Sequence, residues 1–272
     1  MTALPAVADA RPPAILLNNV SKEFRLESGE LVQGTKNQAL RVESGEFVCV
    51  VGPSGHGKST LLNMIAGFTL PTSGTIEVAG RPVKGPGPDR GVVFQRDTLF
   101  LWKRVDENIE FGLKAQGVPK AERKKIVADL LKVIGLERFA KAWPKQLSGG
   151  MRRRVAIAAV LANKPDVLLM DEPFAGLDYL RMSQMHEVLL DLWQEVGRRA
   201  VVMITHDVDE ALTLGDRIIL IKHGEIALNV KVDLARPRTT DDITGDRANE
   251  IRRRVLEAFE EDDQKAGQSA KL

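Results

Sequence analysis

Residues Phe47–Ala66 read FVCVVGPSGHGKSTLLNMIA, and this stretch predicts the fold. A short apolar run, typical of a buried strand, leads into the glycine-rich segment Gly52–Ser59, and residues with an apolar helical face follow it. The spacing G-x-x-x-x-G-K-S between a strand and a helix is that of a phosphate-binding loop. We therefore expect a strand, a tight turn and a helix that together bind a nucleoside triphosphate.

The residue types of this loop suit a polyphosphate. Glycines let the backbone curl so that several N–H groups face one anion, and the helix that begins near Lys58 adds the positive end of its dipole. Lys58 supplies a mobile positive charge, and the hydroxyl of Ser59 can ligate Mg²⁺. The predicted nucleotide contacts are Gly52, Pro53, Ser54, Gly55, His56, Gly57, Lys58, Ser59 and Thr60.

The composition restricts the possible classes of protein. The 272 residues are 43% hydrophobic and 28% charged, which fits one or two globular domains. A net charge of +2 at pH 7 argues against nucleic-acid binding, which usually needs a strong basic excess. The one cysteine, Cys49, excludes an internal disulfide and falls in the predicted buried strand, where inert packing is expected. No run reaches the roughly 18 apolar residues that cross a bilayer, and residues 1–13 are expected to be a flexible lead-in, not a secretion signal.

Strand signals surround the loop, and helical signals follow them. The run Ile15–Val20 and the turns that flank it predict a small, largely antiparallel sheet before and beside the loop. Between about residues 97 and 163 the spacing becomes helical, which predicts a helical insertion between sheet strands. The segments with helical spacing are Glu107–Leu113, Lys120–Val133 and Met151–Ala162.

Polar side chains follow three short apolar runs. They are Gln95, the pair Asp171 and Glu172, and His206. Because the carboxyl ends of parallel strands meet at one edge of a sheet, we expect these side chains beside the phosphate loop. Taken singly, His206 fits an ordinary turn histidine and Gln95 a surface amide, but their places after apolar strands favour a functional site.

Phosphoryl transfer assigns a task to each of these side chains. It requires a metal holder, activation of water and neutralisation of the transferred charge. Asp171 suits the metal, because a carboxylate on a rigid strand is a hard oxygen ligand. Glu172 suits the general base that polarises the attacking water. His206 is expected to bond the terminal phosphate, and Gln95 to sense it and to ligate the metal with Ser59.

A second anion site is predicted at Ser148, Gly149 and Gly150, which directly precede a helix and so expose backbone N–H groups. This site falls in the helical insertion, apart from the phosphate loop. One chain would not readily fold both sites onto one nucleotide. Two chains arranged head to tail could do so, each lending its Ser-Gly-Gly turn to the other.

These motifs resemble those of the ATP-binding subunits of ABC transporters, over about Ile15 to Val230. The resemblance implies an α/β P-loop NTPase fold with a mainly parallel sheet, an N-terminal antiparallel β subdomain and a helical insertion subdomain. It also implies an ATP hydrolase that uses ATP and Mg²⁺ and works as a head-to-tail dimer. The matching segments are GPSGHGKST, Gln95, LSGGM, VLLMDEP, Gly176-Leu177-Asp178 and Thr205-His206-Asp207.

The same resemblance implies further roles. Phe24 would stack on adenine, although its sequence context alone favours a strand aromatic packed inward. Ser148 and Gly150 would contact the γ-phosphate across the dimer, and Asp178 would help couple the two sites. Ala159 departs from the family, because an arginine is usual at its position.

A finer similarity, carried by VFQRD at residues 93–97, Leu101-Trp102 and LSGGM, is to importers of nitrate, sulfonates and taurine. It implies a peripheral subunit at the cytoplasmic face of the inner membrane, with transmembrane permease subunits as partners and, indirectly, a solute-binding protein. No nucleic-acid partner is expected. The alternatives are an exporter or lipid-transport ATPase, a nucleic-acid-linked ABC ATPase and a non-hydrolysing binding module.

The predicted organisation is an ATPase domain over residues 14–235 and a C-terminal extension over residues 236–272. The extension should hold one amphipathic helix and a charged tail. The side chains expected on one side of that helix are Ile251, Val255, Leu256 and Phe259. The apolar cluster Phe100-Leu101-Trp102 is either core or an interaction surface, and under the resemblance it borders, with Gln95, a groove for a permease helix.

Overall fold

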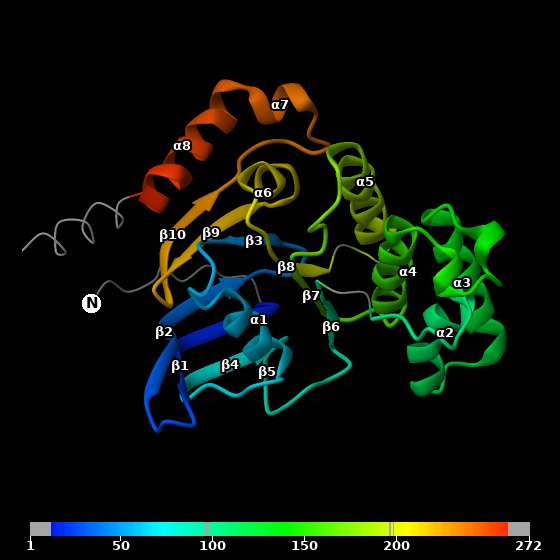
Figure 1. The fold of residues 1–272 in the computed structure, drawn as a ribbon, viewed down its shortest axis with the longest axis horizontal. Helices are drawn as coiled ribbons and strands as arrows, with labels where there is room; N and C mark the ends of the chain where they lie inside the picture. The colour runs from blue at the N-terminus through cyan, green and yellow to red at the C-terminus, as the bar shows by residue number, and fades with distance from the viewer. Residues whose placement is uncertain (1–11, 96–97, 196, 198, 261–272) are drawn as a thin grey trace, which may run out of the picture.

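Two sheets and a group of helices make up the molecule (Figure 1). The computed structural model describes residues 12–95, 98–195, 197 and 199–260. Most of the predicted lead-in, residues 96 and 97 of the VFQRD segment, and the charged tail after Glu260 lie outside the described residues.

The smaller sheet is antiparallel, with strand order β2-β1-β4-β5. Ile15, Leu17 and Val20 of β1 are buried, and the change of phase between Leu17 and Val20 coincides with a register shift in the pairing with β2. The sequence predicted this sheet but not the strand that follows the first turn. Its strands are β1 (Ile15–Arg25), β2 (Leu31–Val42), β4 (Ser73–Val78) and β5 (Arg81–Pro82).

The larger sheet has strand order β10-β9-β3-β8-β7-β6, and its pairs are parallel except for the hairpin of β9 and β10. Every residue of β3 and β8 is buried, because elements cover both faces of a parallel sheet. The predicted mainly parallel sheet is confirmed. Its strands are β3 (Phe47–Val51), β6 (Arg90–Val93), β7 (Val167–Asp171), β8 (Ala200–Ile204), β9 (Arg217–Lys222) and β10 (Glu225–Lys231).

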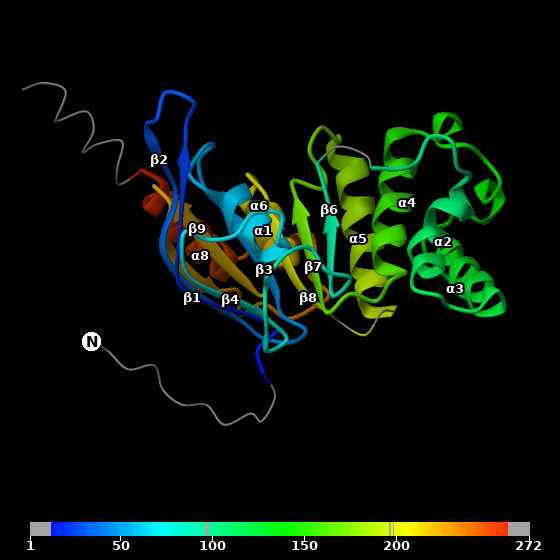
Figure 2. The same ribbon diagram turned by 90° about the horizontal axis from the view of Figure 1, so that it is seen from below.

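The two faces of β3 belong to different cores. Val48 and Val50 pack with α1 (Lys58–Ala66) and the smaller sheet, and α1 contacts strands of both sheets (Figure 2). Cys49 and Val51 point to the opposite face, into the core shared with the other helices. The strand and the helix that flank the phosphate loop are therefore anchored in buried cores.

A group of helices occupies one end of the molecule, beyond α5 in both views (Figures 1 and 2). It holds α2 (Val105–Ala115), α3 (Lys120–Val133) and α4 (Gly149–Leu161), with 3₁₀ turns at Glu137–Phe139 and Pro144–Gln146. Its position in the chain, between β6 and β7, is that of the predicted helical insertion. The helices that flank β8 are α5 (Tyr179–Glu195) and α6 (Val208–Leu214).

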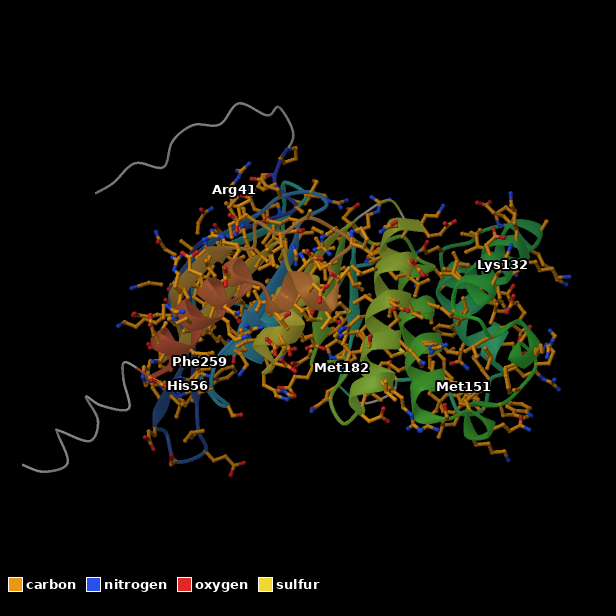
Figure 3. All side chains as sticks on the ribbon, turned by 90° about the horizontal axis from the view of Figure 1, so that it is seen from above. Arg41, His56, Lys132, Met151, Met182 and Phe259 are labelled. Carbon is orange, nitrogen blue, oxygen red and sulfur yellow. The ribbon has the colours of Figure 1, made fainter. Side chains whose placement is uncertain are left out.

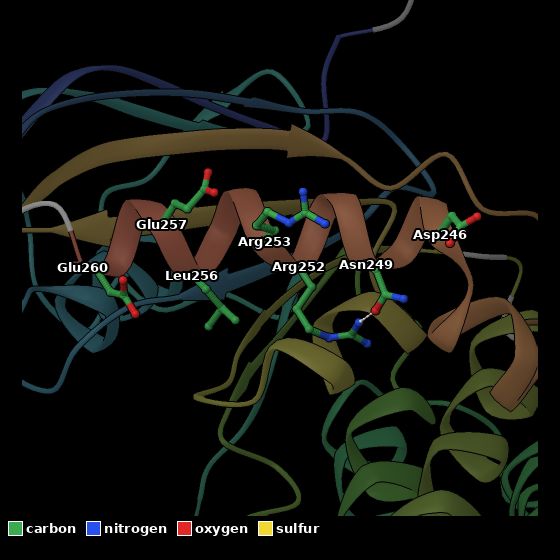
Figure 4. A pocket seen from close by; sticks show the side chains of 7 residues that line it. All are labelled: Asp246, Asn249, Arg252, Arg253, Leu256, Glu257 and Glu260. Carbon is green, nitrogen blue, oxygen red and sulfur yellow. Dashed lines mark hydrogen bonds between the residues drawn. The ribbon is translucent and has the colours of Figure 1, made fainter.

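The chain ends, within its described part, in α7 (Thr240–Thr244) and α8 (Asp246–Glu260). Ile251 and Val255 are buried as predicted, whereas Leu256 is exposed, so its predicted place on the packed side is wrong. At 100° per residue Leu256 lies about 140° around the helix from Ile251. A cavity of about 750 Å³ borders α8, but all the residues that line it belong to that one helix (Figure 4). None of the described helices is both long and apolar enough to cross a membrane.

Candidate nucleotide-binding site

The phosphate loop is packed against two neighbouring strands. A Cβ at Gly52 would lie 2.2 Å from the carbonyl oxygen of Ile221, and one at Gly57 would lie 2.2 Å from that of Gly34. Both positions also have positive φ angles, 149° and 96°. At Gly55 a Cβ would meet no atom within 4 Å, so this part of the loop faces open space. Two of the glycines are thus required for packing, and the third leaves room for a ligand.

Lys58 lies inside the curve of the loop. Its Nζ donates hydrogen bonds to the carbonyl oxygens of Gly52 and Pro53, at 2.7 and 2.8 Å. Burial lowers the pKa of Lys58, while the carboxylates of Glu172 and Asp171 raise it. The ammonium group is therefore held where an incoming phosphate would meet it.

Ser59 and Asp171 meet next to Lys58. Burial raises the pKa of Asp171 and the charge of Glu172 adds to this, whereas a hydrogen bond from Ser59 and the charge of Lys58 lower it. The paired hydroxyl and carboxylate are hard oxygen donors, which Mg²⁺ prefers. Among the described residues there is no group of three or more His, Cys, Asp or Glu that could hold a metal. The hydroxyl of Ser59 and the carboxylate of Asp171 fit a Mg²⁺ ion that would take its remaining ligands from phosphate and water.

The strand ends converge as predicted. Gln95, just after β6, donates from Nε2 to Oε2 of Glu172 at 3.2 Å. His206, just after β8, has its Nδ1 3.8 Å from the same oxygen. Glu172 itself follows β7 with a φ of 42°, which is uncommon for a residue other than glycine, and its N–H donates to the Ile204 carbonyl. The structure thus gathers an amide, a carboxylate and an imidazole around one point beside the loop.

Phe24 lies next to Gly34, which contacts the phosphate loop. A Cβ at Gly34 would lie 2.6 Å from a ring carbon of Phe24, so the ring covers this glycine, whose carbonyl faces Gly57. The residue is 40% exposed, and Nζ of Lys22 lies 5.3 Å from the ring centre. An aromatic packed inward is therefore excluded. A ring partly open to solvent beside the loop is suited to stacking on a base, which stays a prediction.

The second predicted anion site lies elsewhere on the chain. Ser148 caps α4, and its Oγ accepts a hydrogen bond from the N–H of Met151 at 3.3 Å. A Cβ at Gly150 would meet no atom within 4 Å, so the turn is open. Figure 3 places His56 of the phosphate loop and Met151 along the same edge but at opposite ends of the molecule. As expected, one chain does not bring the two anion sites together.

Asp178 stands at the start of α5, at the end of the segment that follows Glu172. Its Oδ1 accepts the N–H of Arg181 at 3.0 Å, and its Oδ2 lies 3.2 Å from Nε of the same residue. Both side chains are exposed. A partner molecule could therefore reach Asp178, and its coupling role stays a prediction.

Arg153 contacts the site, although the sequence motifs did not predict a role for it. This buried residue of α4 donates from Nη1 to the Phe94 carbonyl at 2.6 Å, and from Nη2 to the Gln95 carbonyl. Its position one helical turn before the buried Ala156 and Ile157 indicates an inward face. Because arginines stand on both sides of it, the sequence alone gives little reason to choose it.

A groove of about 380 Å³ opens between β6, α2 and α4. Leu101 and Trp102 beside it are 64% and 72% exposed, and the rings of Phe100 and Trp102 are 5.4 Å apart. Core packing of Leu101 and Trp102 is therefore excluded, and an interaction surface is favoured for them. Gln95 is not among the residues that line the groove. The apolar residues that do line it include Phe100, Phe111, Ala156, Ala159 and Val160.

Comparisons with known proteins agree with this geometry. Residues 35–175 match the family model described as ABC transporter. The nitrate import ATP-binding protein NrtD of a Synechocystis species is 47% identical, over 82% of this chain and 85% of that protein. The taurine import ATP-binding protein TauB of Roseobacter denitrificans is 47% identical, over 75% and 76%. A dimeric ATP-binding cassette in a post-hydrolysis state with ADP and Pi has a TM-score of 0.70 at 36% identity, over 80% of this chain and 98% of that one.

Proposed function

This chain belongs to the ABC transporter family as an ATP-binding and ATP-hydrolysing subunit, and on that premise we propose that it energises import of a small solute through a separate membrane permease. The names of the nitrate and taurine import relatives support import and a solute that is anionic or organic. The observation that carries the proposal is the presence of two open anion sites, at Lys58 and Ser148, at opposite ends of one edge. Such an arrangement needs a second copy to complete each nucleotide site.

In the proposed dimer, each ATP lies between the phosphate loop of one copy and the Ser148 turn of the other. The open backbone at Gly55 and Gly150 supports this, because a phosphate chain can approach both without a steric clash. In a two-fold dimer both subunits use the same surface. Two complete ATP sites therefore form when one edge of each copy carries both anion sites. Asp178 is exposed, follows both sites in sequence and would contact the partner.

Within each site we propose Glu172 as the base that takes a proton from the attacking water. The hydrogen bond from Gln95 orients its carboxylate, and His206, whose Nδ1 lies 3.8 Å from that carboxylate, would contact the terminal phosphate. Ser59, Asp171 and Gln95 are the proposed ligands of Mg²⁺. When bound, that ion neutralises charge on the phosphate oxygens. Phe24 would stack on the adenine.

The groove beside Phe100 and Trp102 is the proposed seat of a short permease helix. Exposed aromatic rings next to an apolar hollow suit the apolar face of such a helix. The hollow borders β6, whose end carries Gln95, so the permease contact and the nucleotide site share a strand. We propose that the subunit works there, on the cytoplasmic face of the membrane, with a solute-binding protein supplying the cargo.

Mixing two inactive variants tests the shared site. Lys58→Ala removes the loop charge, and Ser148→Phe blocks the turn, so each variant alone should lose most ATP hydrolysis. A mixed dimer keeps one intact site, made of Lys58 from one copy and Ser148 from the other. A 1:1 mixture should therefore recover up to about a quarter of the wild-type rate, because about half of the dimers are mixed. A mixture as inactive as its components would contradict the head-to-tail dimer.

The variant Glu172→Gln should bind ATP without turnover and accumulate as a dimer. Light scattering should then give twice the chain mass of 29.9 kDa with ATP, and the single mass without it. Adding Ser148→Phe to this variant should leave ATP bound to a monomer, which separates dimer formation from nucleotide binding. Normal turnover in Glu172→Gln would refute the proposed base.

The solute is tested in cells. A strain without this gene should lose growth on taurine or nitrate as its only sulfur or nitrogen source, and the wild-type gene should restore that growth. The Glu172→Gln gene should not restore it, because the proposed import needs ATP turnover. Growth on both solutes without the gene would exclude them as the cargo.

A further inference from the structure

A buried polar pair lies outside the proposed site. Nε2 of His186 on α5 is 3.1 Å from Oε1 of Glu210 on α6, and the two residues are only 7% and 5% exposed. A hydrogen bond between these two atoms requires that one of them carries a proton. Burying such groups costs free energy unless they are hydrogen-bonded. The pair therefore fixes the two helices against each other.

His186 also contacts the segment that carries the proposed base. Its ring lies 5.1 Å from that of Phe174, edge to face, and Phe174 is two residues after Glu172. Turn hydrogen bonds hold this segment together, since the N–H of Ala175 donates to the Glu172 carbonyl at 3.3 Å. A displacement of Phe174 would therefore move the residue that carries the carboxylate.

Glu210 is connected to His206 through Asp207. Backbone N–H of Glu210 donates to Oδ1 of Asp207 at 3.2 Å, and Asp207 caps α6 directly after His206. The helix has only seven residues, and its place depends on packing because short helices are marginal alone. The side chain of His206 is 70% exposed, so its own contacts do little to fix it.

We infer that His186 is a positioning residue that holds the Glu172 segment and the His206 segment in register for ATP hydrolysis. One imidazole ring contacts both segments, through Phe174 and through Glu210. It thereby sets the relation between a carboxylate and an imidazole whose atoms lie 3.8 Å apart. Small errors in such placement reduce turnover far more than substrate affinity. The inference rests on the catalytic roles proposed for Glu172 and His206.

Steady-state ATP hydrolysis by the full chain tests the inference. His186→Leu removes the hydrogen bond to Glu210 and keeps an apolar side chain against Phe174. We expect kcat per folded molecule to fall about tenfold while the KM for ATP changes by less than about twofold. His186→Gln can still donate to Glu210, so it should recover kcat to within about threefold of wild type.

Two controls separate positioning from loss of stability. Ile251→Ala truncates a buried residue of α8 outside this contact, and should lower the melting temperature without changing kcat per folded molecule. Glu187→Gln, at the exposed neighbour of His186, should behave as wild type. If His186→Leu does not fold, Phe174→Leu tests the other contact and should show the same fall in kcat.

Three results would overturn the inference. They are an unchanged kcat in His186→Leu, an equal fall in the Leu and Gln variants, and an unchanged kcat in Phe174→Leu. The variants Glu172→Gln and His206→Ala, measured in parallel, report on the proposed catalytic roles. Turnover that survives in both would refute those roles, a result distinct from failure of the His186 test.

Discussion

Arg153 and Phe94 lie 59 residues apart in sequence, yet Nη1 of the arginine donates a hydrogen bond to the Phe94 carbonyl across 2.6 Å. A second bond reaches the carbonyl of Gln95. Because Arg153 and Ser148 belong to the same helical segment, this side chain joins the second anion site to the strand end that carries Gln95. Arg153 therefore fixes the backbone at Gln95 relative to α4.

Arg153→Leu should weaken ATP turnover more than ATP binding. Loss of the two donors frees the backbone at Gln95, whose side chain orients Glu172, so we expect kcat to fall about tenfold with a nearly unchanged Kd for ATP. The measurements are steady-state hydrolysis and calorimetric binding. Arg153→Lys keeps one donor group and should lose less, whereas equal activity in the Leu variant and wild type would contradict the linkage.

Phe24→Ala should weaken ATP binding by about tenfold, because stacking on a base contributes on the order of 1–3 kcal/mol. Inorganic triphosphate has no base, so its affinity should stay unchanged. Phe24→Trp should bind ATP at least as well as wild type. Leu256→Ala, at an exposed residue of α8, serves as the control. If Phe24→Ala lowers both affinities equally, the ring acts through the loop and not through adenine.

The strand ends were predictable because parallel topology alone brings them together. Apolar runs that end in Gln95, Glu172 and His206 need no knowledge of side-chain contacts to be placed at one edge. The residues that contact these side chains were harder to predict from the sequence. Arg153 has an arginine on either side, and only the helical phase against Ala156 and Ile157 distinguishes it.

Other features depend on packing that no local pattern contains. Gly52 and Gly57 were expected to serve the phosphate, but strands distant in sequence also require them, through the carbonyls of Ile221 and Gly34. The pair of His186 and Glu210 joins two helices and cannot be inferred from either helix alone. The exposure of Leu256 shows how a residue next to a buried one can face solvent on a helix.

Asp171→Asn should stabilise the chain in the absence of nucleotide. Because the pKa of Asp171 is raised above its ordinary value of 3.8, the folded state holds its proton longer than the unfolded state does, and stability falls as the pH rises through that window. At neutral pH the asparagine avoids this cost, and we expect a gain of about 1 kcal/mol in the free energy of unfolding. The gain should shrink as the pH falls towards the ordinary value of 3.8, because protonation of the wild-type carboxyl removes its charge.

Urea unfolding between pH 4 and pH 8 measures this effect. Asp191→Asn, at an exposed position on α5, is the matched control. The Asp171→Asn protein should at the same time lose Mg²⁺-dependent ATP hydrolysis, since a neutral amide is a weaker metal ligand. If the variant were less stable than wild type at pH 7, the charged Asp171 would not destabilise the folded state.

Cys49 should be inert in the folded protein. Burial raises the pKa of its thiol well above the ordinary value of 9.0, and the charge of Glu210 adds to this. We expect no reaction with a thiol reagent at pH 8 and rapid reaction of one thiol per chain in urea. Rapid labelling of the native protein would show that β3 opens to solvent.

Ala159→Trp should fill the groove and block the proposed permease contact. Ala159 lines the hollow together with Phe111 and Val160, so a large ring there removes the space that a helix would occupy. Hydrolysis by the isolated chain should stay within about twofold of wild type, because the substitution is outside the nucleotide site. Hydrolysis stimulated by the reconstituted permease should fall at least about tenfold, because most of the binding energy of an interface comes from a few residues. Glu122→Gln, on the exposed surface of α3, is the matched control. Full stimulation of Ala159→Trp would place the permease contact elsewhere on the chain.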